Sequence, residues 1–281
     1  MATILQANVG KSTAVVHCIL ETALSRMVDL VLFQQPPTCK DDSMFRPRHP
    51  AYDLLWTSGR VMAARRNDSE WTFSSEDSFS KEAERDVQVL SMRKRGEVIS
   101  KCRIVNVYFQ KKGAEGQFRP AERATCDFLL EECSGPCEVA GDFNTHSQVW
   151  NPHCKTRRNA SFLEDLIASY DLTVLNDDTE TREGSGIHSI IDLTLVSPGM
   201  VGGIINWKVL DLEEGTGSDH RVLEWTVVDD GICGDQEWKF KGWALGNHCN
   251  GRSSVLSGLR CSILPHGTGA RNRRCRLTGG G

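Results

Sequence analysis

Hydrophobic and polar positions divide the start of the chain into three predicted elements. Residues 4–8 (ILQAN) form a short apolar run typical of a β-strand, and residues 12–27 place Val15, Ile19 and Ala23 on one face of a helix. Ser12 precedes this face and suits a helix N-cap. Residues 28–34 (VDLVLFQ) are almost continuously apolar, which indicates a strand that is buried on both faces. The chain is therefore predicted to open with a strand, a helix and a second strand.

Similar patterns continue through residue 228. Further strands are predicted at residues 87–91, 103–108, 138–140, 173–176, 190–196, 204–209 and 222–228. One helix is predicted at residues 120–133, with Pro120 in its first turn and Gly135 beyond its end. A second helix follows Asn159, where apolar residues recur at helical spacing: Phe162, Leu163, Leu166, Ile167 and Tyr170. Many strands with few, widely spaced helices predict an α+β fold of two packed sheets with helices outside.

The composition changes after Asp230. Residues 242–281 contain no Asp or Glu, are rich in glycine and show no periodicity, while arginines gather in residues 270–277 (ARNRRCRL). A segment of this composition cannot bury enough apolar surface to fold alone. We therefore predict one domain at residues 1–230, followed at residues 231–281 by a linker and a disordered Gly/Arg-rich tail.

Length and composition limit the class of protein. A chain of 281 residues, 39% hydrophobic and 25% charged, is long enough for one substantial core. No apolar run is long enough to cross a bilayer, and the start, MATILQANVG, lacks the cationic and apolar regions of a signal peptide. We expect an intracellular protein that does not engage a membrane.

The eleven cysteines are odd in number and scattered, which favours reduced thiols over a disulfide framework. A zinc site would have to draw on residues that lack a second closely spaced ligand pair: Cys133, Cys137, His146, His153 and Cys154. These residues are interpreted as ordinary buried or surface positions.

The net charge of -4 argues against binding duplex DNA by bulk electrostatics, because phosphate contacts need clustered Lys and Arg. If DNA is the substrate, local clusters must provide these contacts. The candidates are residues 93–95, 111–112 and 155–158, and each is also compatible with a simple solvated face.

The motif Gly141-Asp142-Phe143-Asn144 follows the predicted strand at residues 138–140. Positions two apart on extended chain point the same way, so Asp142 and Asn144 can converge on one ligand while Phe143 packs into the core. This pair suits an activated water and a phosphate oxygen.

Two further motifs carry charged groups. Ser218-Asp219-His220 precedes a strand, and there Asp offers an oxygen to a hard cation while His can hydrogen-bond near a phosphate. Ser and Asp are also common in turns, so this motif alone is weak. Asp192 interrupts the apolar strand at residues 190–196 and must either find a partner, such as His220, or face solvent on an edge strand.

These motifs, in this order, together with Asn8 and the strand VNVYFQ, resemble the endonuclease/exonuclease/phosphatase superfamily over about residues 4–228. That superfamily includes deoxyribonuclease I and the exonuclease III-like abasic-site endonucleases. GDFNTHSQVWNP and HSIIDLTLVSP look most like the endonuclease domains of non-LTR (LINE-type) retrotransposons, and RPAERATCDFLLEE and RRNASFLEDLIASYDLTVLND also fit this branch. The resemblance implies a four-layer α/β-β/α sandwich of two packed mixed β-sheets with outer helices, as in deoxyribonuclease I.

The resemblance also implies roles for particular residues. Asn8 and Asn144 would bind the scissile phosphate, Asp142 would position or deprotonate the attacking water, and Tyr108 falls on the family's site tyrosine. His220, paired with Asp192, would stabilise negative charge at phosphorus, and Asp219 would lie on the metal side of the pocket. The expected substrate-binding residues are His146, Trp150, Ser189, Arg157 and Arg158.

One metal ligand departs from the family pattern. The strand after the first helix normally ends in Gln-Glu, and that Glu is the main Mg²⁺ (or Mn²⁺) ligand, whereas here Gln34 is followed by Gln35. A carboxamide brings no negative charge, and magnesium sites depend on one or two carboxylates. We expect weakened metal binding and reduced turnover. Gly10 also stands where related elements often carry Arg.

The resemblance implies a Mg²⁺-dependent, DNA-nicking endonuclease that acts in the nucleus on double-stranded target DNA. It would be a monomer, and its polyprotein would normally carry a reverse transcriptase domain as well. A related phosphoesterase of the same fold and a catalytically inactive relic remain alternatives. The composition break near Gly242 supports the hypothesis of a truncated or decayed copy.

Overall fold

The structure is a computed structural model. It describes residues 1–38, 47–55, 59–76, 86–98, 101–110, 122, 124, 125, 135–184, 187–211 and 216–232. The chain divides into two compact units, Met1–Ala244 and Leu245–Gly281, and all described residues belong to the first. The predicted tail at residues 231–281 lies almost wholly outside the described residues, so the domain boundary at residue 230 stays a prediction.

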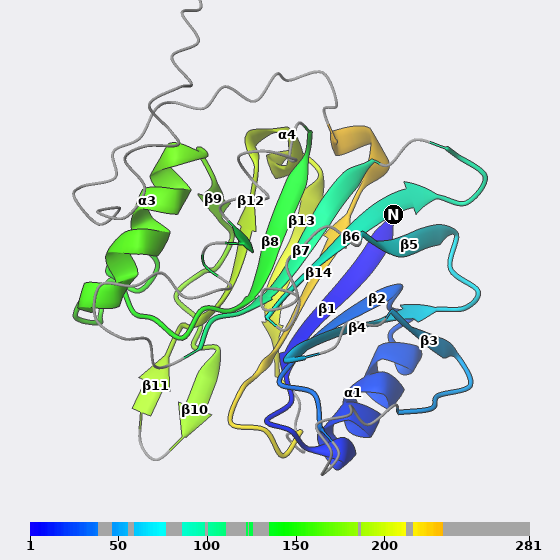
Figure 1. The fold of residues 1–281 in the computed structure, drawn as a ribbon, viewed down its shortest axis with the longest axis horizontal. Helices are drawn as coiled ribbons and strands as arrows, with labels where there is room; N and C mark the ends of the chain where they lie inside the picture. Colours follow the sequence, from blue (N-terminus) through cyan, green and yellow to red (C-terminus); the bar gives the residue numbers. More distant parts are fainter. Residues whose placement is uncertain are drawn as a thin grey trace, which may run out of the picture. The chain divides into compact units, whose positions relative to one another are not determined.

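Two six-stranded mixed sheets form the centre of the described unit (Figure 1). In spatial order, the first sheet contains β13 (Ile204–Leu210), β14 (Val222–Val227), β1 (Ala2–Asn8), β2 (Leu30–Gln34), β4 (Val61–Arg66) and β3 (Tyr52–Leu55). The second contains β5 (Trp71–Glu76), β6 (Val87–Lys94), β7 (Cys102–Tyr108), β8 (Cys137–Asp142), β12 (Asp192–Val196) and β9 (Thr173–Val174). Only the β1–β2 and β7–β8 pairs are parallel among these described strands.

Helices α1 (Thr13–Ser25) and α3 (Ser161–Ser169) cover the outer faces of the first and second sheet, respectively. Helix α1 begins as predicted, because the Ser12 hydroxyl accepts a hydrogen bond from the backbone N–H of Val15. The layers therefore run helix, sheet, sheet, helix, which confirms the expected sandwich. Shorter elements complete the unit: α4 (Pro198–Val201), the hairpin of β10 (Arg182–Gly184) and β11 (Ile187–Ser189), and 3₁₀ turns at Arg158–Ala160 and Asp229–Gly231.

Three hydrophobic clusters hold these layers together. The cluster between the sheets contains residues from both, such as Ile4, Leu32, Ile104 and Trp225. A second cluster lies under α1, and a third lies under α3. Side chains alternate along each strand, so Ile4 faces the other sheet while its neighbour Leu5 packs under α1.

The predicted elements are largely confirmed, with two groups of differences. Strand β8 extends two residues beyond the predicted 138–140, and β9 is shorter than the predicted 173–176. Strands β3, β4 and β5 had no counterpart in the sequence prediction. The predicted helix at residues 120–133 lies mostly outside the described residues, although residues 122, 124 and 125 have helical backbone.

Gly141 lets β8 lie close to β7. A Cβ at this position would lie 1.9 Å from the carbonyl oxygen of Val107, which is far inside contact distance. The glycine of the Gly-Asp-Phe-Asn motif therefore has a packing reason, because any larger residue would push apart the two strands that deliver Tyr108 and Asp142.

Among the described residues, no helix is both long and apolar enough to cross a membrane.

Candidate active site

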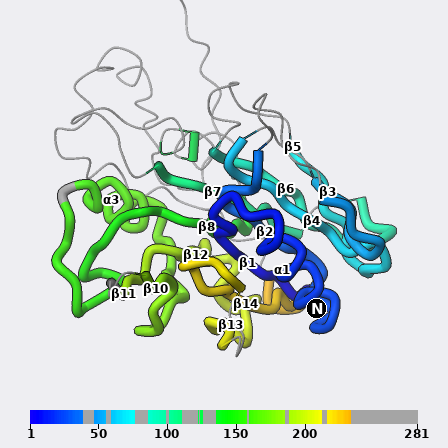
Figure 2. Tube along the Cα trace, turned by 90° about the horizontal axis from the view of Figure 1, so that it is seen from below, coloured from blue at the N-terminus to red at the C-terminus, as the bar shows by residue number. Residues whose placement is uncertain are grey.

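Polar side chains occupy one end of the space between the two sheets. Ile4 faces this space, so the alternation also turns Asn8 into it at the end of β1, and the same alternation turns Tyr108 and Asp142 inward at the ends of β7 and β8. Figure 2 looks onto this end of the strands, where β10 and β11 lie beside β12. Strands that are apolar along most of their length thus deliver polar groups to one edge of the sandwich.

Asp142 lies at the centre of this group and is 1% exposed. Its Oδ2 accepts hydrogen bonds from the side-chain amides of Asn8 (2.8 Å) and Asn144 (2.9 Å), and its Oδ1 accepts one from the backbone N–H of Asn144 (2.9 Å). Burial, and next the negative charge of Asp192, raise the pKa of Asp142 to about 7, against the opposing effect of His220. A carboxylate with this pKa can accept a proton near neutral pH.

Asp192 and His220 form a buried pair beside Asp142. The Nδ1 of His220 lies 2.8 Å and 3.0 Å from the two carboxylate oxygens of Asp192, which also accepts a hydrogen bond from the Thr181 hydroxyl (3.0 Å). Asp192 is 1% exposed on β12, between β8 and β9, so the alternative of a solvent-facing edge residue is wrong.

The Asp192 contact leaves the other ring nitrogen of His220 facing the centre. Its Nε2 lies 4.0 Å from the Asp142 carboxylate. Burial lowers the pKa of His220, but the charge and hydrogen bond of Asp192, together with the charges of Asp142 and Asp219, outweigh it and raise the pKa overall. His220 therefore tends to stay protonated, with Nε2 able to donate a hydrogen bond.

Asn144 is held in a backbone conformation with φ of 48°, in the left-handed region that Asn tolerates better than most residues. Its side-chain amide donates to the carbonyl of Phe109 as well as to Asp142. The intervening Phe143 is fully buried against Phe109, as the motif predicts. Asp142 and Asn144 thus meet at one point.

Tyr108 lies next to Asp142 across the β7–β8 pairing and is 6% exposed. Burial, followed by the charge of Asp142, raises the pKa of its hydroxyl to about 12. The hydroxyl is therefore neutral at physiological pH and can act as a hydrogen-bond donor.

Gln35 follows β2 directly and also has a left-handed backbone, with φ of 50°. Its N–H donates to the carbonyl of Arg60 (2.7 Å), and its carbonyl accepts from the N–H of Lys11 (2.8 Å). Since β1 and β2 pair in parallel with Asn8 opposite Gln34, Gln35 lies just beyond Asn8 at the same edge. A conformation that is costly for a non-glycine residue is thus fixed by contacts on both sides.

Asp219, the other predicted group on the metal side, is paired with Arg182. The Nε and Nη2 of Arg182 donate to Asp219 Oδ2 at 2.8 Å and 2.6 Å. Burial tends to raise the pKa of Asp219, but the hydrogen bond and charge of Arg182 lower it overall, so the carboxylate stays ionised. Arg182 was missed in the sequence because it lies 37 residues from Asp219.

These groups do not fit a magnesium ion. Among the described residues, only Asp142, Asp192 and His220 meet closely enough at this centre to share an ion, and Asp142 and Asp192 are already engaged by hydrogen bonds. On the metal side, Gln35 is neutral and Asp219 is neutralised by Arg182. Magnesium sites depend on one or two carboxylates, and on the side of Gln35 the predicted carboxylate, Asp219, is already paired with Arg182.

The predicted substrate-binding residues are placed differently from one another. Trp150 is 4% exposed within the cluster under α3, and Ser189 is 1% exposed, so burial gives no support to a substrate contact by either. His146 is partly exposed. Its pKa is lowered most by partial burial and further by the positive charges of Arg157 and Arg182. Arg157 is exposed, and the side chain of Arg158 lies outside what the structure describes.

Two inter-sheet contacts near the site were missed in the sequence. The guanidinium of Arg60 donates two hydrogen bonds to Asp86, one of them 2.7 Å long, and the backbone of Asp86 accepts a hydrogen bond from the N–H of Tyr108. The amide of Gln34 donates to that of Asn106 across the sheets at 2.7 Å. Buried polar residues at alternate positions in otherwise apolar strands were the available signal.

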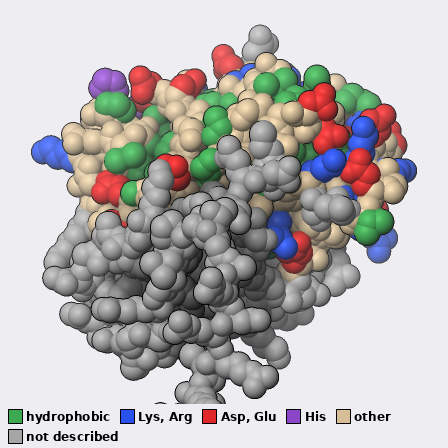
Figure 3. Space-filling model, turned by 90° about the horizontal axis from the view of Figure 1, so that it is seen from above, with side chains coloured by type: hydrophobic (Ala, Val, Ile, Leu, Met, Phe, Trp, Pro, Cys, Tyr) green, Lys and Arg blue, Asp and Glu red, His purple; other side chains and the backbone are tan. Residues whose placement is uncertain are grey.

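Of the basic clusters proposed for DNA, only residues 93–95 are fully described, and they do not lie at the site. Strand β6 has its Val87 end beside the site, because Val87 pairs with Val107, the neighbour of Tyr108. Lys94 lies at the other end of β6, where it pairs with Trp71. Figure 3 views the molecule from the side opposite to Figure 2, and there basic side chains are interspersed with acidic ones. Residues 111–112 lie outside the described residues.

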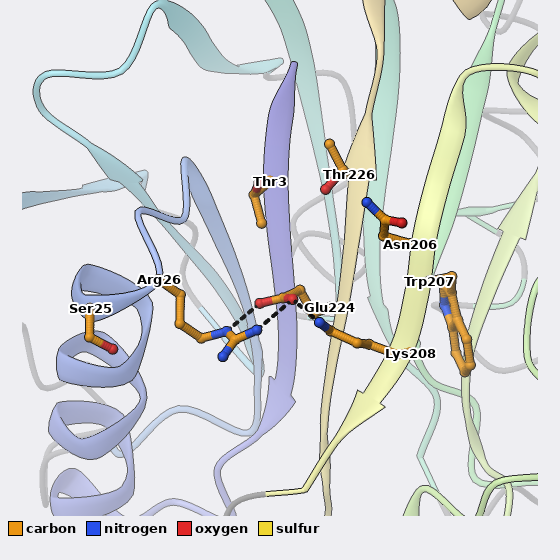
Figure 4. A pocket seen from close by; sticks show the side chains of 8 residues that line it. All are labelled: Thr3, Ser25, Arg26, Asn206, Trp207, Lys208, Glu224 and Thr226. Atoms are coloured by element: carbon orange, nitrogen blue, oxygen red, sulfur yellow. Dashed lines mark hydrogen bonds and ion pairs between the residues drawn. The ribbon is translucent and has the colours of Figure 1, made fainter.

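A polar hollow of about 500 Å³ lies on the outer face of the first sheet (Figure 4). It is lined by Thr3, Ser25, Arg26, Asn206, Trp207, Lys208, Glu224 and Thr226. The Glu224 carboxylate there accepts hydrogen bonds from Arg26 and pairs with Lys208 at 2.9 Å. The hollow is separate from the Asp142 centre. Thr3 lies at the end of β1 that is remote from Asn8, and Thr226 lies at the end of β14 that is remote from His220.

One protein family model and several solved structures resemble this chain. Residues 102–224, less than half of the chain, match the family model described as endonuclease-reverse transcriptase. No curated protein sequence matches the chain.

Several solved structures share the fold. The endonuclease domain of TRAS1, a telomere-specific non-LTR retrotransposon, is 18% identical, with a TM-score of 0.65 over 81% of this chain and 98% of that domain. The AP endonuclease LMAP from Leishmania major is 11% identical, with a TM-score of 0.58 over 80% and 87% of the two chains. The 3′ phosphatase NExo from Neisseria, bound to a product DNA hairpin, is 18% identical, with a TM-score of 0.55 over 81% and 99%.

The described unit has the deoxyribonuclease I-like fold, and its two sheets carry the polar centre at one edge. Residues 102–224 resemble the endonuclease-reverse transcriptase family, and the fold is that of solved structures from the endonuclease/exonuclease/phosphatase superfamily. Members of this superfamily are hydrolytic nucleases and phosphatases, and they generally use divalent metals.

Proposed function

We propose that this domain binds double-stranded DNA at the Asp142–His220 centre and hydrolyses a phosphodiester bond, with turnover weakened by Gln35. The observation that carries the proposal is the buried Asp192–His220 pair, whose free Nε2 lies 4.0 Å from Asp142. The endonuclease-reverse transcriptase family model and the likeness to a retrotransposon endonuclease support DNA as the substrate. A nuclear site of action and a reverse transcriptase domain on the same polyprotein follow from that assignment.

His220 acts on the developing negative charge. Asp192 accepts a hydrogen bond from Nδ1 of His220, which fixes the orientation of the ring. The N–H at Nε2 is then left to donate a hydrogen bond to a non-bridging phosphate oxygen. The raised pKa of His220 favours the protonated ring, in which Nε2 carries this proton. Fixed donors of this kind stabilise the transition state more than the ground state.

Asp142 acts on the attacking water. With a pKa of about 7, Asp142 can accept the water proton as the water oxygen bonds to phosphorus. The bond to the 3′ oxygen breaks in the same step, and this leaving oxygen takes up a proton from solvent. The product is then a nick with a 3′-hydroxyl and a 5′-phosphate. The amides of Asn8 and Asn144 hold the carboxylate in position, and Tyr108 offers a neutral hydroxyl to the phosphate.

Gln35 is the proposed cause of weak turnover. In the family pattern a carboxylate at this position attracts the divalent ion, and a neutral amide on the same fixed backbone cannot replace its charge. Restoring the carboxylate tests this directly. We expect Gln35→Glu to raise the initial rate of supercoiled-plasmid nicking in Mg²⁺ or Mn²⁺ by about tenfold or more.

Two variants control that experiment. Asn67→Asp adds the same negative charge at an exposed position and is expected to leave the rate unchanged. Gln35→Glu combined with Asp142→Asn removes the proposed base and should abolish the gain. If Gln35→Glu nicks no faster than the unmodified protein, Gln35 does not limit turnover and this part of the proposal is wrong.

Two other functions are separated by the same assay. A non-catalytic relic, favoured by the Arg182–Asp219 pair and by Gln35, predicts that no variant nicks DNA. A related phosphoesterase predicts hydrolysis of smaller phosphoesters, such as inositol phosphates, in preference to plasmid DNA. A panel of both substrate types, run with the Gln35→Glu variant, therefore distinguishes the three.

A further inference from the structure

The segment that carries Arg182 is paired with the segment that carries Asp219 and His220. Its backbone forms a β-bridge with His220, and the N–H of Glu183 donates to the carbonyl of Asp219 at 2.8 Å. On the other side, the N–H of Arg221 donates to the carbonyl of Thr181 at 2.7 Å. The guanidinium thus extends from a strand that is paired with the segment carrying Asp219 and His220.

The guanidinium places a positive charge close to the phosphate-binding groups. It contacts Asp219 Oδ2, while Asp219 Oδ1 lies 3.9 Å from His220 Nε2. Burial lowers the pKa of His146, and the positive charges of Arg157 and Arg182 lower it further, so the histidine lies within electrostatic range of both arginines. Within the described part of the chain, the Nη1 of Arg182 has no hydrogen-bond partner and remains available to a ligand.

We propose that the guanidinium of Arg182 supplies the positive charge beside Asp219 and His220, so that this site binds a phosphodiester without a divalent ion. The inference rests on the proposed function only in taking the Asp142–His220 centre as a phosphodiester site. It follows from the misfit to magnesium described above, since Gln35 removes one negative charge and Arg182 neutralises another. A guanidinium is always protonated and matches the geometry of phosphate oxygens.

A binding experiment tests the inference first. A fluorescently labelled DNA duplex is titrated with the protein at fixed ionic strength, in EDTA and in Mg²⁺, and anisotropy gives the Kd. We expect the unmodified protein to bind equally well in both, and Arg182→Gln to weaken binding in EDTA about 10- to 100-fold. Arg182→Lys, which keeps the charge but loses the planar fork, should fall between the two.

Arg221→Gln is the matched control. Arg221 is adjacent to His220 and forms an ion pair with Glu183, so the substitution removes the same charge from the same region without touching the Asp219 contact. We expect its Kd to change by about threefold or less, as for a surface charge. Equal weakening by Arg182→Gln and Arg221→Gln would overturn the inference, because the effect would then be general electrostatics.

Metal binding provides a second, independent readout. Mn²⁺ is titrated into the protein and followed by electron paramagnetic resonance, for the single variants Gln35→Glu and Arg182→Gln and for the double variant. We expect the double variant to bind Mn²⁺ at least about tenfold more tightly than Gln35→Glu alone, because Asp219 is released and a like charge is removed. A double variant no tighter than Gln35→Glu would overturn the inference.

Failure of this inference is distinguishable from failure of the proposed function. An unmodified protein that binds DNA only in Mg²⁺, or not at all, overturns the role of Arg182, yet nicking by Gln35→Glu would still uphold the proposed function. If EDTA-resistant binding depends on Arg182 but no variant nicks DNA, the inference stands and the catalytic proposal fails.

Discussion

Glu138 is a buried acid whose protonation should set the pH dependence of stability. It lies on β8, facing the inter-sheet space, and is 0% exposed. Its Oε2 accepts a hydrogen bond from the indole N–H of Trp225 at 3.1 Å, and Oε1 has no partner among the described residues. Burial raises the pKa of Glu138 to about 8, against the smaller opposing effect of Trp225. The carboxyl is therefore mainly protonated in the folded protein at neutral pH.

The sign of the effect follows from proton linkage. The unfolded chain loses this proton near the ordinary pKa of 4.5, whereas the folded chain keeps it up to about pH 8. Between these pH values the folded state binds one more proton than the unfolded state. The free energy of unfolding therefore falls by about 1.4 kcal/mol for each unit by which the pH rises. At pH 7 the accumulated loss is about 3 kcal/mol, a large part of the stability of an ordinary domain.

The substitution Glu138→Gln tests this reasoning. An amide resembles the protonated carboxyl in shape and still accepts the Trp225 hydrogen bond, but it does not ionise. We expect the variant and the unmodified protein to unfold similarly at pH 5, and the variant to be more stable by about 3 kcal/mol at pH 7. Urea unfolding at pH 5, 6, 7 and 8, followed by tryptophan fluorescence, gives the four differences.

Glu70→Gln serves as the matched control, because it exchanges the same carboxyl for the same amide at an exposed position. The informative quantity is the change with pH, so a constant offset caused by the new amide does not matter. A difference between Glu138→Gln and the unmodified protein that stays constant from pH 5 to pH 8 would refute the reasoning.

Three other predictions concern the active site and its support. Gly141→Ala should destabilise the domain by about 3 kcal/mol or more in chemical denaturation, because its Cβ would overlap the carbonyl of Val107; no measurable loss would contradict this packing. Asn106→Leu should lower the free energy of unfolding by about 1–3 kcal/mol, because it leaves the amide of Gln34 without its partner. The double variant with Gln34→Leu should lose less than the sum of the two single losses, and additive losses would argue against coupling between the two residues. Nicking by the Gln35→Glu variant should rise about tenfold per pH unit below pH 7 and then level off, since burial and Asp192 raise the pKa of Asp142 to about 7; a rate independent of pH would exclude Asp142 as the base.

The sequence determined the parts of the fold that local patterns encode. The cap at Ser12, the buried strand before Gln34 and the alternation that turns Asp142 inward all depend on neighbouring residues, so each could be predicted from spacing alone. Strands β3 and β4 were missed because their short runs show no clear alternation, whereas β5 does alternate apolar and polar residues after a turn-forming run at residues 67–69 and could have been predicted. The predicted roles of the site residues remain predictions, although the structure brings Asn8, Asp142, Asp192 and His220 together.

The tertiary structure decided which charges meet. The residues of the Asp192–His220 pair could be named from the sequence, but the Arg182–Asp219, Arg60–Asp86 and Gln34–Asn106 contacts join positions far apart in the chain. The sequence could reveal that Gln35 lacks a charge, yet only the folded chain places a guanidinium on the remaining carboxylate. The physical reason is that local conformation depends on neighbouring residues, whereas the electrostatics of a site depends on every charge within a few ångströms, whichever segment supplies it.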